Sequence, residues 1–335
     1  MEYPIIQAPM AGGASTPKLA ATVSNAGGIG FLAAGYKTAG EMVSEIEETL
    51  RLTDRPFGVN VFVPSKEVVD EAVLLAYREK IQKEAQSVGV LIGQATTDDD
   101  DWDSKITALK ELRVAIVSFT FGCPESRIIK ELQEAGSLVA ISVTNLDEAK
   151  IAVAAGADIL CAQGIEAGGH RASFENQTEG DQGLIELIKM IKKESNVPMI
   201  AAGGLMEGKD ITAVLAAGAV AAQLGTAFLR CPESGASPAH KAALHDSRFS
   251  KTAITRAFSG RRARGLVNRF LEEYDREAPN AYPHVHHMTK QMRKVAGQKE
   301  QPELMALWAG QGHRRSRELP ASQLMEKLVE EMKSE

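Results

Sequence analysis

The sequence predicts an α/β protein that folds as a (β/α)₈ barrel and carries a smaller, mostly helical cap domain inserted after the eighth strand. Short apolar runs without polar alternation recur along the chain, as in parallel strands that are buried on both faces. Alanine-rich helical stretches end directly before several of these runs, at Gly136, Gly156 and Gly218. Glycine suits the left-handed residue that ends a helix. Repeated strand–helix units of this kind predict the TIM-barrel architecture.

The predicted strands follow one another with helical patterns between them. After the first strand, Gly12-Gly13 predicts a break, and Ser15-Thr16-Pro17 predicts a capped helix start. The eight strands are expected at 4–10, 29–34, 57–63, 114–121, 138–143, 158–163, 198–203 and 219–225. A doubly wound open sheet is the alternative, because a sequence does not show whether the last strand closes on the first.

Two segments exceed the length of a simple barrel, which takes about 250 residues of a 335-residue chain. Residues 65–113 contain the acidic run Asp98–Asp101, which we expect to be a solvated loop without an assigned function. The polar, helical segment after the eighth strand predicts the cap. We therefore expect the barrel at 1–233, a substrate or cap domain at 234–302 and, at 303–335, a segment that packs back on the barrel.

Composition restricts the class of protein. A hydrophobic fraction of 44% with 24% charged residues is typical of a globular protein with a sizeable core. The formal net charge of −6 argues against general nucleic-acid binding. Cys123, Cys161 and Cys231 lie far apart and predict neither a disulfide framework nor a zinc site. Neither a signal peptide nor a membrane span is expected, so the predicted location is cytoplasmic.

Residues suited to a flat ligand lie where the predicted strands end, which is where barrels of this kind have their active sites. The first strand ends in Ala8, Pro9 and Met10, which leave room for a planar group. Asn60 lies in the third strand and Gln163 ends the sixth. Their amides can both donate and accept hydrogen bonds, as the edge of a flavin ring requires.

Glycines follow the seventh and eighth strands, at Gly203-Gly204 and in the run Gln223-Leu224-Gly225-Thr226. Such barrels commonly bind a phosphate at these two positions through backbone N–H groups. Tight turns without a ligand are the alternative. A GxGxxG motif after a strand is missing, so a nicotinamide Rossmann site is not supported. Glycines and amides together predict a phosphorylated planar cofactor, for which flavin mononucleotide (FMN) is one candidate.

The loop after the sixth strand combines Gly168 and Gly169 with His170. Glycine lets the backbone approach a ligand closely, and imidazole is suited to move a proton near neutral pH. A glycine-rich turn with a surface histidine is the alternative interpretation. At the end of a barrel strand, His170 is our candidate catalytic residue, as a base that can also bind an anionic substrate when it is protonated.

With these strand ends, glycines and histidine loop, the chain resembles the nitronate monooxygenases of the 2-nitropropane dioxygenase family, most closely their class I bacterial branch. The matching segments run nearly end to end, at 7–13, 24–28, 58–60, 119–122, 166–171, 201–205, 223–226 and 307–312. The Glu-Ala-Gly-Gly-His run at 166–170 also occurs in FMN-dependent enoyl-acyl-carrier reductases, so it indicates the superfamily. The segments 121–124 and 308–312 favour the nitronate branch.

The resemblance implies an FMN-dependent enzyme that oxidises alkyl nitronates with O₂ to a carbonyl compound and nitrite, without NAD(P)H and through a flavin semiquinone. His170 matches the histidine expected to bind the nitronate and to act as base. Some relatives carry a second active-site histidine in the segment matching Ser118–Gly122, which this chain lacks, so the use of neutral nitroalkanes is in doubt. The predicted cofactor-binding residues are Ala8, Pro9, Met10, Asn60, Gln163, Gly168, Gly169, Gly203, Gly204, Gln223, Leu224, Gly225 and Thr226.

Two other functions stay open at this point: an FMN-dependent NAD(P)H reductase of enoyl-thioesters or quinones, and a barrel that binds a phosphate ligand without redox chemistry. His284, His286 and His287 form a further cluster. Carboxylates and cysteines are missing at ligand spacing in the sequence around them, so we predict no metal site there. We expect them in the cap near the cleft, with Tyr282 as a candidate substrate contact.

Overall fold

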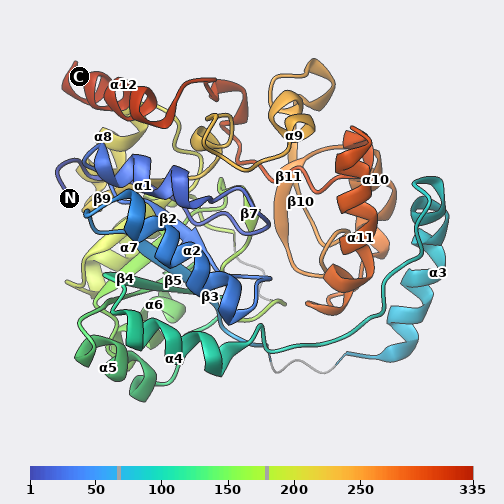
Figure 1. Ribbon diagram of the computed structural model, residues 1–335, viewed down its shortest axis with the longest axis horizontal. Coiled ribbons are helices and arrows are strands. Elements are labelled where there is room, and N and C mark those ends of the chain that lie inside the picture. Colours follow the sequence, from blue (N-terminus) through green and yellow to red (C-terminus); the bar gives the residue numbers. More distant parts are fainter. Residues whose placement is uncertain (66–68, 178–180, 335) are drawn as a thin grey trace.

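Eight parallel strands form the barrel that the sequence predicts (Figure 1). The computed structural model describes residues 1–65, 69–177 and 181–334. The barrel strands are β1 Ile5–Gln7, β2 Phe31–Ala33, β3 Gly58–Phe62, β4 Ile116–Thr120, β5 Leu138–Val143, β6 Ile159–Gln163, β8 Met199–Ala202 and β9 Ala221–Leu224. Each strand lies inside one of the eight predicted runs, so the predicted strand positions are confirmed.

The sheet closes on itself. Its strand order is β1-β9-β8-β6-β5-β4-β3-β2, and all neighbours in this order are parallel. The two ends meet at a parallel bridge between Ile6 and Ile29, where the N–H of Gln7 donates to the carbonyl oxygen of Ile29 at 2.9 Å. A sheet that joins its first and last strands is a barrel, so the alternative of an open sheet is excluded.

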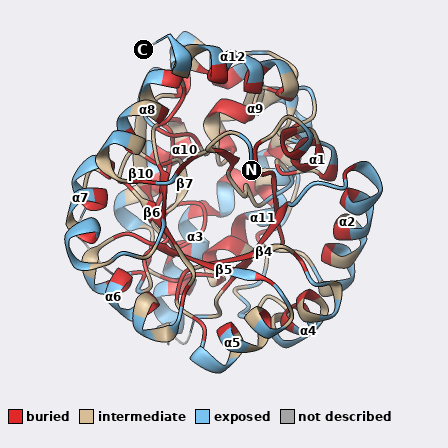
Figure 2. Cartoon of the chain, turned by 90° about the vertical axis from the view of Figure 1, so that its left-hand side faces the viewer, coloured by how far each residue is buried: buried red, intermediate tan, exposed pale blue. Residues whose placement is uncertain are grey.

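Helices surround the barrel, as the end-on view in Figure 2 shows. They are α1 Pro17–Asn25, α2 Ala39–Leu52, α4 Trp102–Leu112, α5 Ser126–Glu134, α6 Leu146–Ala155, α7 Leu184–Glu194, α8 Gly208–Ala217 and α12 Ala321–Lys333. The predicted glycine ends are confirmed, since Gly136, Gly156 and Gly218 have φ angles of +101°, +100° and +116°. The C-terminal helix α12 packs against α8 and α1, which returns the end of the chain to the barrel.

A second part of the molecule lies to the right of the barrel in Figure 1 and has a hydrophobic core of its own. It holds α9 Pro238–Ala243, β10 Thr252–Thr255, β11 Ala263–Leu266, α10 Arg269–Tyr274 and α11 His284–Gln298. We call this part the cap. Short 3₁₀ helices complete the described chain: η1 Thr226–Phe228, η2 Ser247–Phe249, η3 Asp275–Glu277, η4 Pro302–Leu304 and η5 His313–Arg315. Among the helices of the described residues, none is long and apolar enough to span a membrane.

The segment 65–113 belongs to both parts. Its first helix, α3 Glu71–Ser87, packs on α11, and Tyr77 and Ile81 are buried in the cap core. Its second helix, α4, covers the barrel next to α2 and α5. Residues 66–68 of this segment lie outside the described residues. The domain limits 1–233, 234–302 and 303–335 stay predictions.

A two-residue strand, β7 Gly169–His170, joins the barrel to the cap. It follows β6 after a short loop and pairs antiparallel with β11, which places His170 opposite Ala263 in a three-stranded sheet with β10. We expected a loop here. Two residues are too few to show the period-two alternation by which a strand is recognised in a sequence.

Candidate active site

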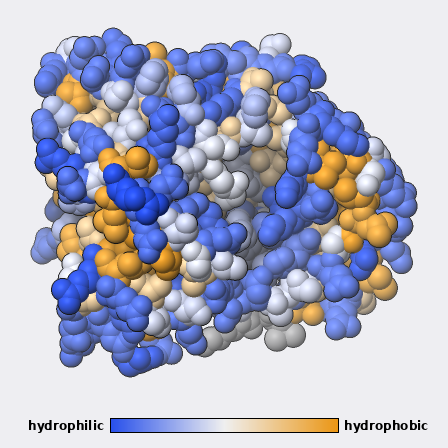
Figure 3. All heavy atoms as spheres, in the orientation of Figure 1, coloured by the Kyte–Doolittle hydropathy of each residue, from blue (hydrophilic) through white to orange (hydrophobic). Residues whose placement is uncertain are grey.

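A cavity of about 800 Å³ lies between the C-terminal ends of the barrel strands and the cap, and the surface in Figure 3 is hollowed between the two parts. This volume is within the range of about 300–1,000 Å³ that cofactor and small-molecule sites have. Of the predicted site residues, those that line it are Ala8, Pro9, Met10, Asn60, Gln163, Gly168, Gly169, His170, Gly203, Gly204, Gln223, Gly225 and Thr226.

Two predicted residues do not line this cavity. Leu224 is 1% exposed and belongs to the barrel core, and its carbonyl oxygen accepts the N–H of Ala8 at 2.8 Å. Tyr282 is buried in a small cluster with Phe62 and Phe121 and lines a smaller neighbouring cavity instead. Its ring still lies 5.9 Å from the ring of His170, measured between centroids. Tyr282 could therefore contact a ligand only at the margin of the main cavity.

Backbone N–H groups face one end of the cavity, where β8 and β9 end. Gly203 and Gly204 have φ angles of +132° and +72°, a conformation that glycine adopts without strain. Among the described residues, no acceptor takes the N–H of Gly203, Gly204 or Gly225. The hydroxyl oxygen of Thr226 accepts the N–H of Gly310 at 3.0 Å, which leaves the hydroxyl proton to donate. Free N–H groups beside a hydroxyl donor suit an anion such as a phosphate. We call Gly203, Gly204, Gly225 and Thr226 the glycine cradle.

The amides of Asn60 and Gln163 line the same cavity. The Nδ2 atom of Asn60 donates to the hydroxyl oxygens of Ser118 and Thr120 at 2.9 and 3.0 Å, so the amide oxygen is the atom left for a ligand. Gln163 shows the opposite arrangement, because its oxygen accepts Nη1 of Arg171 at 2.8 Å. Its nitrogen keeps a hydrogen that can be donated. The pair therefore offers one acceptor and one donor to a ligand.

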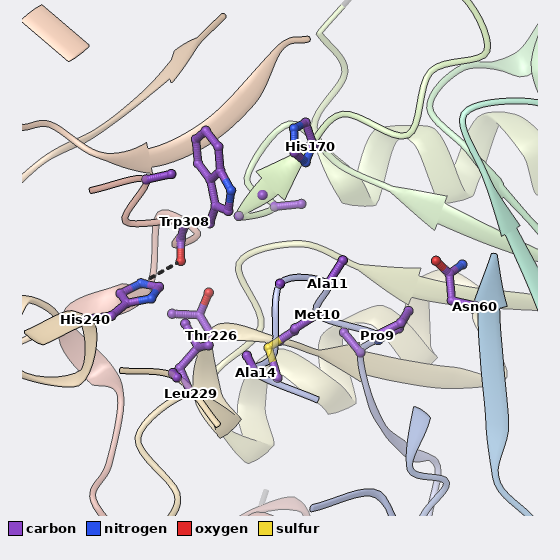
Figure 4. Close-up of a pocket in the computed structure, with 18 of the residues that line it drawn as sticks. Pro9, Met10, Ala11, Ala14, Asn60, His170, Thr226, Leu229, His240 and Trp308 are labelled. Atoms are coloured by element: carbon purple, nitrogen blue, oxygen red, sulfur yellow. Dashed lines mark hydrogen bonds between the residues drawn. The ribbon is translucent and has the colours of Figure 1, made fainter. Parts of the chain in front are cut away.

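His170 lies across the pocket from Pro9 and Met10, beside Trp308 (Figure 4). Its carbonyl oxygen accepts Nε2 of Gln163 at 3.0 Å. The ring is packed between aromatic groups, with the ring of Trp308 at 5.4 Å and that of Phe121 at 5.7 Å between centroids. The backbone and the ring of His170 are thus both held in place, which a catalytic group requires.

Burial lowers the pKa of His170 to about 3, and the positive charges of Arg261 and Arg293 lower it in the same direction. The imidazole is therefore neutral near pH 7 and free to accept a proton. A pKa this low also makes the ring a weak proton acceptor in the absence of a ligand, so both predicted roles of His170 stay predictions. An anion bound beside the ring would raise the pKa of His170 again.

The cap contributes cationic and polar residues that the sequence analysis did not assign to the site. Arg261 is 2% exposed, and its guanidinium lies 4.0 Å from the centre of the Phe121 ring. From α11, Lys290, Arg293 and Lys294 line the cavity, and from α9, His240 lines it and contacts the carbonyl oxygen of Trp308 at 3.1 Å (Figure 4). The helical spacing of the α11 residues was the available signal, because residues three and four apart share one face.

A smaller cavity of about 400 Å³ adjoins the main one and shares Tyr36, Phe62, His286 and Lys290 with it. The acidic run Asp98–Asp101 lines this second cavity, although we expected only a solvated loop. His286 is stacked on Tyr36 with 4.0 Å between ring centroids.

His287 lies 2.8 Å from a carboxylate oxygen of Asp98, a partner that is distant in the sequence. Within residues 1–65, 69–177 and 181–334, no group of three histidine, cysteine, aspartate or glutamate side chains is arranged to hold a metal ion.

A closed barrel with free glycine N–H groups, two amides and an imidazole around one capped cavity has the architecture of an enzyme with a small-molecule site. The nitronate monooxygenase family model matches residues 1–331. The chain belongs to this family of flavin-dependent oxidoreductases, which confirms the resemblance found in the sequence.

Individual relatives agree with the family. A probable nitronate monooxygenase of Bacillus subtilis (strain 168) is 39% identical, over 98% of this chain and 95% of that protein. A nitronate monooxygenase of Pseudomonas aeruginosa PAO1 is 41% identical, over 99% and 97% of the two chains. A nitroalkane oxidase from Streptomyces ansochromogenes, known from a crystal structure, is 49% identical in sequence. The two structures have a TM-score of 0.97, and the match covers 99% of this chain and 96% of that one. FabK from Thermotoga maritima is more distant, at 28% identity and a TM-score of 0.78 over 100% and 94%.

Proposed function

We propose that this enzyme binds FMN in the main cavity and oxidises alkyl nitronates with O₂ to a carbonyl compound and nitrite, without NAD(P)H. The observation that carries the proposal is the single cavity that His170 lines together with the glycine cradle and the two amides. The family and the similarity to a nitroalkane oxidase support nitro compounds as the substrate class.

The residues present fit FMN. Its phosphate would take the free N–H groups of Gly203, Gly204 and Gly225 and the hydroxyl proton of Thr226. Its ring edge carries donors and acceptors, which match the free oxygen of Asn60 and the remaining N–H of Gln163.

The loop after β6 passes close to the C-terminal segment. A side chain at Gly168 would meet the backbone of Gly310 at 2.4 Å. Residues 308–312 therefore lie directly beside the cradle and would help to enclose the phosphate.

Each residue has a role in this reaction. Bound FMN would supply the redox chemistry, taking electrons from the nitronate carbon and passing them to O₂. His170 would contact the nitro group or the acidic carbon beside it, and its neutral ring can accept a proton where a neutral nitroalkane is the substrate. Phe121 and Trp308, packed around the imidazole, would exclude water from it.

Anaerobic mixing tests the proposal. The FMN-loaded protein is mixed in separate experiments with propyl-2-nitronate, NADH and NADPH, and the flavin absorbance is followed. We expect the nitronate alone to reduce the flavin. Rapid reduction by a nicotinamide instead would support the reductase of enoyl-thioesters or quinones. A protein that stays colourless after FMN is added would contradict both functions and leave a phosphate-binding barrel.

A further inference from the structure

The backbone of His170 is fixed from both sides, by the hydrogen bond from Gln163 and by the pairing of β7 with β11. Two properties of the side chain remain to be set: the orientation of the ring and the nitrogen that carries the proton in the neutral form. In histidine these are decided by the group that contacts each ring nitrogen.

Ser259 contacts one of the two nitrogens. Its hydroxyl oxygen lies 2.8 Å from Nε2 of His170, and Ser259 is only 1% exposed. The same hydroxyl donates to the carbonyl oxygen of Arg261 at 3.2 Å. A serine hydroxyl has a single proton to give. Both contacts are made at once when the hydroxyl donates to Arg261 and its oxygen accepts the hydrogen bond from His170, and in that arrangement Nε2 carries the ring proton.

The other ring nitrogen, Nδ1, makes no hydrogen bond to the described residues. Within the described chain this atom is not among the fully buried polar atoms that lack a partner, so it keeps accessible surface. Since His170 lines the main cavity, that surface opens onto the ligand space.

We propose that Ser259 is a positioning residue that holds His170 in the Nε2–H form and thereby presents an unprotonated Nδ1 to the substrate. The proposal rests on the proposed function, in which His170 contacts the substrate. With a neutral nitroalkane, the C–H bond next to the nitro group breaks, the proton goes to Nδ1, and the electron pair stays on the substrate as the nitronate anion. The imidazolium keeps its hydrogen bond from Nε2 to Ser259 throughout.

The step also divides the substrates into two groups. A nitronate supplied as the anion has already lost the proton, so its oxidation does not need Nδ1 as a base. A neutral nitroalkane does need it. Loss of Ser259 should therefore affect the neutral substrate far more than the anion, whereas a general disturbance of the fold would affect both.

The ring proton can be observed directly. Nitrogen–proton correlation spectra of the FMN-loaded protein with ¹⁵N-labelled histidine distinguish the Nε2–H from the Nδ1–H form, and His170→Asn identifies the signal. We expect His170 to be in the Nε2–H form in the wild type and to become a mixture in Ser259→Ala. A wild-type protein in the Nδ1–H form, or a Ser259→Ala variant with an unchanged pattern, overturns the proposal.

Kinetics give the second measurement. We expect Ser259→Ala to lower kcat/KM for nitroethane about tenfold, as for the loss of one hydrogen bond. The same variant should change kcat/KM for ethyl nitronate by less than about twofold. Ser259→Thr, which keeps the hydroxyl, should restore most of the loss with nitroethane. The matched control is Ser137→Ala, since Ser137 is 3% exposed and donates to the carbonyl oxygen of Val114 at 2.6 Å, away from the cavity.

Equal losses for both substrates would overturn the proposal, as would a similar loss in the Ser137 control. Failure of the proposed function can be told apart from failure of the proposed role of Ser259. A protein with the Nε2–H signal that oxidises neither substrate contradicts the proposed function, and the role of Ser259 in setting the tautomer stands.

Discussion

The two sides of the cavity use different chemistry. The barrel side consists of backbone N–H groups, small residues and two amides, and its predicted site residues carry no charge. The cap side has Arg293, Lys290 and the imidazole of His170, whose strand β7 is paired with the cap sheet. The barrel is therefore suited to hold a cofactor that every turnover needs, and the cap to contact and select what reacts with it.

The two sides also differ in the contacts that fix their residues in place. A barrel loop is fixed between a strand and a helix that lie next to it in the chain. The cap side depends on distant contacts, such as those of the buried Arg261 with the carbonyl oxygens of Arg171 and Ser173. A change on the cap side should therefore alter reactivity, and a change on the barrel side should alter cofactor binding.

The largest effect is expected for His170→Asn. Asparagine keeps a polar side chain but cannot act as a base near pH 7, so nitroethane turnover should fall by about 10² or more, while FMN binding is retained because the cradle is unchanged. Steady-state oxygen consumption and the flavin absorbance of the purified variant measure the two properties. His245→Asn is the control, because His245 is exposed and does not line the cavity. Unchanged nitroethane turnover would remove His170 from the mechanism, and loss of FMN would contradict the division between the two sides.

The sequence predicted the barrel side well and the cap side poorly, for a physical reason. Strand hydrophobicity and glycine helix ends are local signals, so the eight strands and residues such as Gly203 could be placed from short windows. The contact between His170 and Ser259 joins positions 89 apart, and no pattern near Ser259 shows what it faces. β10 and β11 were hidden in a polar segment that we predicted to be helical. His170 was recognised from its glycine-rich loop at a strand end, and the family resemblance added its expected role.

Gly203→Ala should have the next largest effect, on the barrel side. The added methyl group would lie 3.1 Å from the backbone nitrogen of Ala167, at a φ of +132° that alanine rarely adopts. The turn must therefore shift, and its N–H groups would no longer point together at a phosphate. We expect FMN to bind about tenfold more weakly, which is equivalent to about 1.4 kcal/mol of strain and lost contacts. Fluorescence titration of the apoprotein with FMN measures this.

Gly136→Ala is the matched control for that variant. Gly136 has a similar φ of +101°, and a methyl group there would meet no atom within 4 Å. It should lower the free energy of unfolding by about 1 kcal/mol and leave FMN affinity unchanged. If both variants lose FMN affinity equally, general backbone strain and not the cradle would explain the effect.

The smallest effect concerns acid stability, to which the cavity histidines contribute. Burial lowers the pKa of His240 to about 4, a shift that its hydrogen bond with the Trp308 carbonyl opposes. The unfolded chain takes up this proton below about pH 6.5 and the native state only near pH 4, so the free energy of unfolding falls as the pH is lowered through that window. His240→Gln removes the titration and can still donate to the carbonyl of Trp308. Urea unfolding at about pH 5 and pH 7.5 should show the acid-induced loss reduced by about 1 kcal/mol in the variant, a value discounted for partial exposure. If the variant loses as much stability as the wild type, His240 is protonated in the native protein at pH 5, and the cavity wall beside Trp308 is wetter than its packing indicates.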